Sequence, residues 1–384
     1  MSHALPFRLS APTDGRVDLL VIAAEHSGDQ HAGRMVAGLL AAEPDRRVCA
    51  LGGPALAAGG AQLLEDLTTQ STMGFAVFGR LSFYRALMAE VVRWVGEHRP
   101  KAVCFIDSSG LNLRIAQKLF NARIAAKAGG PTRLVYYISP QVWASRSGRR
   151  FKMGWHLDAL ASIFPFEKDV YADTDLPVSF VGHPFVASDY RPPVALDPEG
   201  PILLLPGSRQ GLVQRLMPVM AEAFQRVGGD RKALVLYPSE SIEAQLTAMN
   251  LPPEIELRAT VEHDDPVGAS AVLTTSGTLS MHCALAGIPG VVTFKTDPLT
   301  YWLGRMIVKV KFIGISNLLL QREMYPELVQ GAALAEAMAR ELRASLEDSR
   351  RRARVAEDAA ELRDLLSQAT DATPPDWIAR QLAS

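Results

Sequence analysis

Two acidic side chains stand directly after short apolar runs, where a strand would end. Glu25 follows VDLLVIAA, and Asp107 closes KAVCFID. After Glu25, Gly28 permits a sharp turn into a helix whose first N–H groups are free to bind an anion or another ligand. Ser27 and Asp29 are good helix caps, so capping explains part of this motif without a ligand.

Two roles fit Asp107. Its carboxylate, placed at a strand end, can act as general base toward an acceptor hydroxyl. It can equally form an Asx-turn by accepting hydrogen bonds from backbone N–H groups two residues on. The residues alone favour neither role.

A permanent cation follows another apolar run. In ILLLPGSRQG, Gly207 and Ser208 form a turn, and Arg209 projects where the strand ends. A guanidinium pairs in a bidentate way with phosphate oxygens. Phosphate recognition is therefore favoured for Arg209 over a surface salt bridge.

The segment SGTLSMHCALAGIPG has the pattern of a tight turn, a short helix and a Gly-Pro stop. Ser276, Gly277 and Thr278 present N–H groups and hydroxyls at a helix N-terminus, which makes a second phosphate seat. His282 lies one turn beyond Thr278 in the same row, within reach of a ribose or sugar attached to a diphosphate. The alternative for His282 is a partly buried histidine with a partner inside the protein.

Two further segments hold candidate binding residues. Gln141 lies with Trp143 and Arg146 in YYISPQVWASRSGRRFK, which either lines an acceptor site or begins a surface helix. Asn317 and Arg322 lie in NLLLQREMYPELVQ, close to the expected ligand cleft.

The elements that position these residues follow from alternating short apolar runs and amphipathic helical patterns. Continuous apolar strands separated by helices predict parallel sheets that are covered on both faces. We expect two doubly wound domains facing each other across a central cleft, with ligands at the carboxyl ends of the strands. The strands are expected at 17–24, 47–52, 101–107, 133–139, 159–164, 178–182, 201–207, 232–238, 255–259, 270–276 and 290–295.

A stretch rich in Pro and turn residues after Pro184 indicates the domain boundary. The expected organisation is a Rossmann-like domain over 1–187, a linker over 188–200, a second Rossmann-like domain over 201–345, and terminal helices over 346–384. Packing of those terminal helices on the first domain is one option.

Composition limits the class of protein. With 384 residues, 48% hydrophobic and 21% charged, the chain suits a soluble two-domain protein. A net charge of -1 argues against nucleic acid as a partner. Three widely spaced cysteines read as reduced thiols, with neither zinc spacing nor a disulfide framework. No secretory signal or membrane span is expected, which predicts a cytoplasmic protein.

Together, and in this order, the motifs resemble those of the lipid-A-disaccharide synthases, inverting glycosyltransferases of GT-B type. The resemblance runs from about residue 21 to residue 330 and includes EHSGD, IDSSGLN, YYISPQVWA, FPFEK, LLPGSR and the block around PLTYWL. It implies transfer of a diacylglucosamine from UDP to the 6-hydroxyl of a diacylglucosamine 1-phosphate, forming a β-1,6 disaccharide. It implies neither a metal nor a cofactor. The first domain then holds the acceptor and the second holds the nucleotide sugar.

The resemblance also assigns roles. Asp107 matches the family's general-base candidate, and Arg209 matches its diphosphate-binding arginine. Glu25 matches the acid of the first loop, while Asn317 and Arg322 match polar residues of the donor site. The family's partners are the two acylated sugars and the inner leaflet of the inner membrane of a Gram-negative bacterium; a homodimer is left open.

Three positions depart from the family pattern. His282, Val77 and Leu212 stand where the resemblance leads us to expect glutamates. A neutral imidazole can bond one ribose hydroxyl but cannot accept from two, as a carboxylate does. Three readings compete with the synthase: a related transferase with another donor or acceptor, a UDP-sugar epimerase, and a non-catalytic binder.

Residues 73–95, MGFAVFGRLSFYRALMAEVVRWV, interleave aromatic side chains with Arg80 and Arg85. A core helix is the default interpretation. A membrane-docking surface is the alternative, because rings at the headgroup boundary and arginines against anionic lipid would hold the protein on a bilayer.

Overall fold

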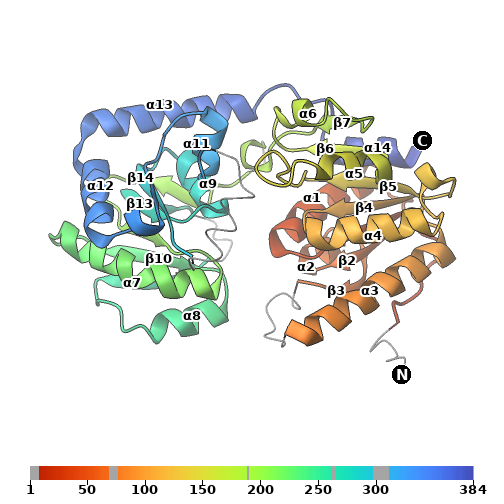
Figure 1. Cartoon of the computed structure of the whole chain (residues 1–384), viewed down its shortest axis with the longest axis horizontal. Helices are drawn as coiled ribbons and strands as arrows, with labels where there is room; N and C mark the ends of the chain where they lie inside the picture. Colours follow the sequence, from red (N-terminus) through yellow and green to blue (C-terminus); the bar gives the residue numbers. More distant parts are fainter. Residues whose placement is uncertain (1–7, 69–76, 188–189, 261–264, 297–310, 384) are drawn as a thin grey trace. The chain divides into compact units, whose positions relative to one another are not determined.

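The computed structural model describes the chain except residues 1–7, 69–76, 188–189, 261–264, 297–310 and 384. The chain forms two compact units (Figure 1). The first comprises Met1–Pro184 with Gln368–Ser384, and the second comprises Phe185–Ser367. Each unit has its own parallel sheet and core, so each is described by itself.

The sheet of the first unit has the order β3-β2-β1-β4-β5-β6-β7, and every neighbouring pair is parallel. Starting from β1, the chain builds outward through β2 and β3, then returns to the other side of β1 with β4. The switch point of the topology therefore lies between β1 and β4. The strands are β1 (Leu19–Ala23), β2 (Val48–Gly52), β3 (Gln62–Asp66), β4 (Ala102–Ile106), β5 (Arg133–Tyr137), β6 (Ala159–Ser162) and β7 (Val178–Phe180).

Helices cover both faces of this sheet, which is why β1, β2 and β4 are apolar at every position and wholly buried. Leu20 and Phe105 join one core with the helices α3 (Val77–His98), α4 (Ser109–Asn121) and α5 (Arg149–His156). Val21 and Cys104 join the opposite core with α1 (His26–Ala42), α2 (Pro54–Ala58) and α14 (Pro374–Ala383). The end of the chain thus returns to the first unit, where Trp377 is buried.

The sheet of the second unit has the order β11-β10-β9-β13-β14-β15 and is also parallel throughout. Its switch point lies between β9 and β13. The strands are β9 (Ile202–Leu205), β10 (Ala233–Tyr237), β11 (Ile255–Ala259), β13 (Ala271–Thr274), β14 (Gly290–Phe294) and β15 (Glu327–Val329), and β8 (Val194–Leu196) pairs separately with β12 (Val267–Ala269).

One core of this unit joins its sheet to α7 (Gln210–Val227), α8 (Glu240–Thr247) and α12 (Ala335–Glu347). A second helical group consists of α9 (Thr278–Leu285), α11 (Ile315–Leu320) and α13 (Ser349–Leu366), which contact one another. Asp348 begins α13 by accepting hydrogen bonds from two N–H groups of its first turn. Residues 346–367 therefore belong to the second unit, and only α14 packs on the first.

All eleven strands expected from the sequence are present, and the α/β class with two Rossmann-like units is confirmed. The sequence analysis missed four short strands, β3, β8, β12 and β15. Within the described ranges, no helix is both long and apolar enough to span a bilayer.

Candidate functional site

The first cluster of candidate residues lies at the switch point of the first unit. β1 and β4 pair in register, with Ala23 opposite Ile106, so the loops that follow them lie side by side. Ser108 Oγ is 3.2 Å from Glu25 Oε1, which brings the two acidic loops into contact. Ligands of open α/β sheets bind at this kind of position.

Gly28 brings the first turn of α1 against the second loop. A Cβ atom at Gly28 would lie 3.6 Å from Asp107 Cβ, which is ordinary contact distance. Gly28 is buried, Ser27 is half-buried, and Glu25 is exposed at the N-cap position of α1. The sequence therefore placed these residues correctly at one sheet edge.

The expected capping of α1 is wrong. The N-cap residue of α1 is Glu25, and no side chain caps this end. Asp29 is fully buried and accepts hydrogen bonds from the N–H groups of Gly53, Ala55 and Leu56 at distances of 2.8 to 3.2 Å. Asp29 thus caps the neighbouring helix α2, which leaves the N-terminus of α1 unfilled by its own side chains.

Asp107 is held in an unusual backbone conformation. Its φ is 47° and that of Ser108 is 40°, in the left-handed region that non-glycine residues seldom adopt. Tyr136 Oη donates to the carbonyl oxygen of Asp107, and Asn112 Nδ2 donates to the same oxygen at 3.0 Å. Strain that neighbours fix in this way is typical of functional sites.

The environment of Asp107 favours a proton acceptor with a usable pKa. Burial and, to a smaller extent, the nearby carboxylate of Glu25 raise the pKa of Asp107 to about 6, against the opposing effect of a hydrogen bond from the N–H of Ser108. Among the described residues, no N–H two residues on bonds this carboxylate, so the Asx-turn alternative has no support in the structure. A carboxylate of this pKa is ionised at neutral pH and a stronger base than an ordinary one.

The loops that follow β5 and β6 complete this edge of the sheet. Gln141 is exposed on the first of them, as an acceptor-lining residue would be. The sequence analysis missed Glu167, which is fully buried and accepts from Trp143 Nε1 and Phe164 N, each at 3.3 Å. Burial raises the pKa of Glu167 to about 8, so it ties the two loops together as a neutral acid. The motif FPFEK was its only signal in the sequence.

The second cluster lies at the switch point of the second unit. β9 and β13 pair in register, with Leu205 opposite Thr274, and α7 and α9 begin shortly after them. Gly207 has a φ of 99°, and a Cβ there would lie 3.1 Å from Thr275 Oγ1, so the turn needs glycine. Neither helix has an acidic residue in its first turn, which leaves both positive helix ends uncompensated.

Arg209 and Ser208 are exposed at the start of α7, with Arg209 at the N-cap position. No ion pair involves Arg209 among the described residues. The alternative of a surface salt bridge therefore has no support in the structure. The guanidinium and the helix end are both available to an anion.

The loop before α9 is more occupied than the sequence suggests. Ser276 Oγ donates to the carbonyl oxygen of Ile313 at 2.6 Å, and the N–H of Gly277 donates to Ser280 Oγ at 3.2 Å. The N–H of Gly277 therefore already has a partner, which corrects its assignment as a phosphate donor. Thr278 is exposed and keeps its hydroxyl and N–H at the helix end.

His282 does not face open space. Its side chain is 8% exposed, its ring centroid lies 3.9 Å from that of Phe185, and its Nδ1 forms a hydrogen bond with Tyr190 Oη. The structure thus supports the alternative of a partnered histidine over a ribose contact. Leu212, in the first turn of α7, is partly buried against the core, whereas the side chain of Val77 lies outside the described part.

We expect His282→Glu to lower the free energy of unfolding by about 1–3 kcal/mol, because it places a charge in a buried aromatic site. Thermal denaturation at pH 7 measures the effect, with Tyr190→Phe as the milder control that removes only the hydroxyl. Unchanged stability together with tighter UDP binding would instead show that position 282 contacts the ribose.

Asn317 and Arg322 are not available to a substrate. Asn317 is fully buried; its Oδ1 accepts from the N–H groups of Met324 and Tyr325, and its Nδ2 donates to Tyr325 O and Glu327 Oε1. Glu327 also accepts from the N–H of Ile313, whose carbonyl holds Ser276. Asn317 is therefore a support of the 276–278 loop and not a ligand contact.

Arg322 is engaged by two carboxylates of α13. Its Nη2 lies 2.6 Å from Asp358 Oδ1 and pairs with Glu361 as well. These pairs raise the pKa of Arg322 above its usual range. The assignment of Arg322 to a donor site is corrected for this reason: its charge is already balanced.

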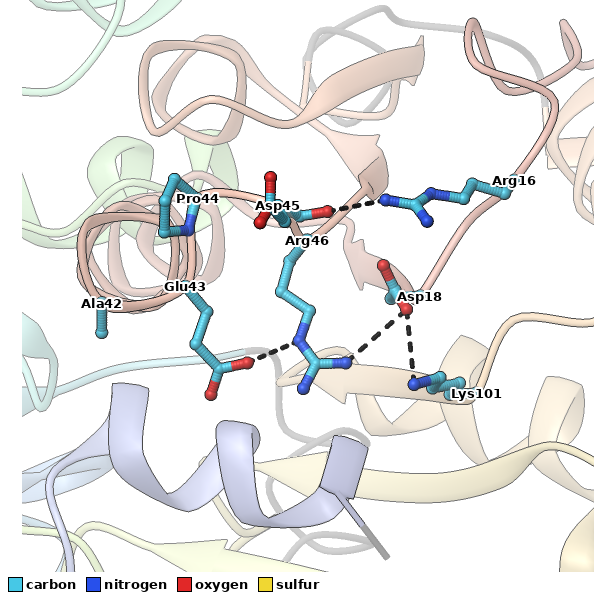
Figure 2. Close-up of a pocket in the computed structure, with 8 residues that line it drawn as sticks. All are labelled: Arg16, Asp18, Ala42, Glu43, Pro44, Asp45, Arg46 and Lys101. Atoms are coloured by element: carbon cyan, nitrogen blue, oxygen red, sulfur yellow. Dashed lines mark hydrogen bonds and ion pairs between the residues drawn. The ribbon is translucent and has the colours of Figure 1, made fainter.

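A surface hollow exists at the opposite edge of the first sheet (Figure 2). Asp18, Arg46 and Lys101 line it just before β1, β2 and β4, at the amino ends of the strands. Asp18 Oδ1 lies 3.6 Å from Arg46 Nη1 and 3.7 Å from Lys101 Nζ. The acidic and basic side chains that line this hollow therefore balance one another, and the hollow lies at the end of the sheet opposite the switch-point loops.

Solved structures of low sequence identity share this fold. A putative UDP-N-acetylglucosamine 2-epimerase from Listeria monocytogenes is 14% identical with a TM-score of 0.57, over 90% of this chain and 94% of that one. The calicheamicin glycosyltransferase CalG4 is 14% identical with a TM-score of 0.54, over 96% and 99% of the two chains. The two Rossmann-like units with their switch-point loops thus define a protein of the GT-B class.

Within that class, the family is shown by sequence. The model of the lipid-A-disaccharide synthetase family matches residues 19–380, and the chain belongs to this family. The lipid-A-disaccharide synthase of Myxococcus xanthus (strain DK1622) is 35% identical over 92% of this chain and 94% of the relative. Lipid-A-disaccharide synthase 1 of Legionella pneumophila (strain Philadelphia 1) is 33% identical over 83% and 85%.

Proposed function

We propose that the protein transfers 2,3-diacylglucosamine from UDP to the 6-hydroxyl of 2,3-diacylglucosamine 1-phosphate, forming the β-1,6 disaccharide and releasing UDP. Family membership supports the substrates. The observation that carries the chemistry is Asp107, a half-buried carboxylate of raised pKa at the first switch point. A base of this kind is what an attacking hydroxyl needs.

The two units carry different parts of the proposed reaction. In the first unit, Asp107 takes the proton of the acceptor hydroxyl while the oxygen of that hydroxyl attacks the anomeric carbon of the donor. In the second, Arg209, the N-terminus of α7 and Thr278 at the start of α9 stabilise the negative charge that develops on the departing diphosphate. A single base and a direct displacement invert the anomeric configuration, so an α-linked donor gives a β-linked product.

The three positions that lack an expected glutamate, His282, Val77 and Leu212, bear on the alternatives to the synthase activity. A transferase with a changed donor or acceptor would keep Asp107 and Arg209 but alter the contacts to the sugars. An epimerase needs acid and base groups around one sugar and uses no lipid acceptor. A non-catalytic binder needs no catalytic groups and no acceptor. Of the replaced positions, His282 is buried and Leu212 is partly buried against the core of the second unit, which supports a packing role for these two side chains.

The test uses UDP-2,3-diacylglucosamine with and without the acceptor. The proposed function requires UDP release only when 2,3-diacylglucosamine 1-phosphate is present, with a disaccharide of the summed mass. An epimeric sugar formed without acceptor would identify an isomerase. Binding of the donor with neither outcome would identify a non-catalytic binder.

We also propose that the protein works at the inner face of the inner membrane, because both substrates are lipids. The described part of the 73–95 segment is not the docking surface. Leu87, Trp94 and Val95 are buried in the core, and Phe83 and Tyr84 pack against it, so this half of α3 is a core helix. Phe78 lies outside the part whose side chains are described.

The outer face of α5 is a better docking surface. Among the described residues, Trp155 and Phe151 are the exposed large aromatic side chains, at 66% and 39%, and they lie four positions apart on one face. Lys152 is exposed beside them, and the helix sequence RRFKMGWH has no acidic residue. Aromatic rings at the headgroup boundary with cations beside them complement an anionic phospholipid surface.

We expect the double substitution Phe151→Glu, Trp155→Glu to weaken binding to anionic phospholipid vesicles by about tenfold or more, since it removes the buried rings and adds repulsion. Vesicle sedimentation measures the bound fraction. The control Leu334→Glu alters another exposed apolar residue, on the second unit. Equal sedimentation of the α5 variant and wild type would exclude this surface.

A further inference from the structure

The start of α5 reaches the loop that holds Asp107. Arg149, the first residue of α5, donates from Nη1 to Ser109 Oγ at 3.2 Å. Ser109 is the first residue of α4 and comes two positions after Asp107. A half-buried guanidinium therefore contacts the start of α4, two residues after the candidate base, at a position that the sequence analysis did not single out.

Two more arginines lie close to Arg149. The carbonyl oxygen of Arg146 accepts from the N–H of Arg149 at 2.9 Å, and Arg114 lies on α4, the helix that contacts α5. Burial lowers the pKa of Arg149, and the charges of Arg146 and Arg114 act in the same direction, against an opposing effect of Tyr136. Such repulsion is relieved when an anion binds among them.

These cations form no ion pair with the described residues. None of the ion pairs found there includes Arg114, Arg146 or Arg149. The next residue along, Arg150, shows the contrast: its Nε and Nη2 donate to the two carboxylate oxygens of Asp173, at 2.7 and 2.6 Å. Of the two adjacent arginines in SGRRFK, Arg150 thus forms a structural ion pair, whereas Arg149 belongs to a cluster that forms none with the described residues.

The cluster is open to a ligand. A Cβ atom at Gly110, in the first turn of α4, or at Gly148, just before α5, would meet nothing within 4 Å. The first turn of α4 has no acidic residue, so its positive end adds to the field of the arginines. Guanidinium groups next to such open backbone suit the oxygens of a phosphate monoester.

We propose that Arg149, with Arg146 and Arg114, binds the phosphate of the acceptor sugar. This inference rests on the proposed function, which supplies a 1-phosphate and a reacting 6-hydroxyl. In a pyranose, C1 and C5 flank the ring oxygen, so a phosphate on C1 and the hydroxymethyl group on C5 both extend from the same edge of the ring. An acceptor whose hydroxyl meets Asp107 therefore holds its phosphate within reach of a neighbouring cation. The diphosphate of the donor is served by Arg209 instead.

The test compares Arg149→Gln with Arg150→Gln, its matched neighbour. Arg149→Gln is expected to raise the KM for 2,3-diacylglucosamine 1-phosphate about 10–100-fold, the range for a hydrogen bond to a charged group, while the Kd of UDP stays unchanged. Arg150→Gln should leave both values close to wild type. With 2,3-diacylglucosamine lacking the phosphate, the difference between Arg149→Gln and wild type should disappear.

An unchanged acceptor KM would overturn the proposal, and so would weaker UDP binding, which would assign these arginines to the nucleotide. If Arg149→Gln does not fold, Arg146→Gln answers the same question. Calorimetric binding of glucosamine 1-phosphate, compared with glucosamine, separates this subsite from the transfer reaction. Loss of phosphate-dependent binding in the variant supports the subsite even if no disaccharide forms, whereas equal binding rejects it.

Discussion

Replacing Asp107 with asparagine is expected to lower kcat by about 10²–10⁴-fold, because the variant keeps the shape of the side chain and removes the base. In the wild type, kcat/KM should fall as the pH drops below about 6, the pKa to which burial and Glu25 raise this carboxyl. The rate of sugar transfer to the acceptor, measured in single turnovers across pH 5–8, tests both effects. The residual activity of Asp107→Asn should lack this acid limb.

The contribution of Asp107 to stability should depend on pH in the opposite direction to its contribution to activity. The pKa of Asp107 is higher in the folded state than its ordinary value of 3.8, so its contribution to stability is full below that value and is lost as pH rises through about 6. Asparagine does not ionise, so Asp107→Asn should match or exceed the wild-type Tm at pH 8. A lower Tm with activity spared would show that Asp107 is a structural residue of the loop.

Replacing Arg209 with alanine is expected to lower kcat/KM by about 10²–10³-fold, the cost of removing one preorganised group that stabilises transition-state charge. The fold should be unaffected, because Arg209 is exposed and forms its N-cap contacts through the backbone. Arg215→Ala is the matched control on the same helix, where the side chain donates only to Gly211 O at 2.9 Å. Turnover of Arg209→Ala within a factor of about 3 of wild type would exclude the role.

The sequence predicted the parallel sheets and their ligand-binding edges because buried strands carry a continuous apolar signal. Glu25 and Asp107 were expected at strand ends, and the register of β1 with β4 brings them together. The missed strands β3 and β15 lie at the edges of their sheets and are only half-buried, so polar residues interrupt their pattern. An edge strand needs less apolar surface than a central one.

The partners of individual side chains were harder to predict. Asp29 has the type and position of a cap for its own helix, yet it caps α2, 24 to 27 residues further along the chain. His282 meets Tyr190 from a segment 92 residues earlier, and Arg149 meets Ser109 across 40 residues. Such contacts depend on how elements pack, which local spacing does not encode.

The central claim is that acceptor activation and departure of the diphosphate are carried by separate residues, Asp107 and Arg209, one in each unit. Titration of UDP into wild type, Asp107→Asn and Arg209→Ala by calorimetry tests it most directly. Asp107→Asn is expected to bind UDP as tightly as wild type while its turnover is lost, and Arg209→Ala is expected to lose UDP affinity. Loss of UDP binding in Asp107→Asn, with normal binding in Arg209→Ala, would contradict it.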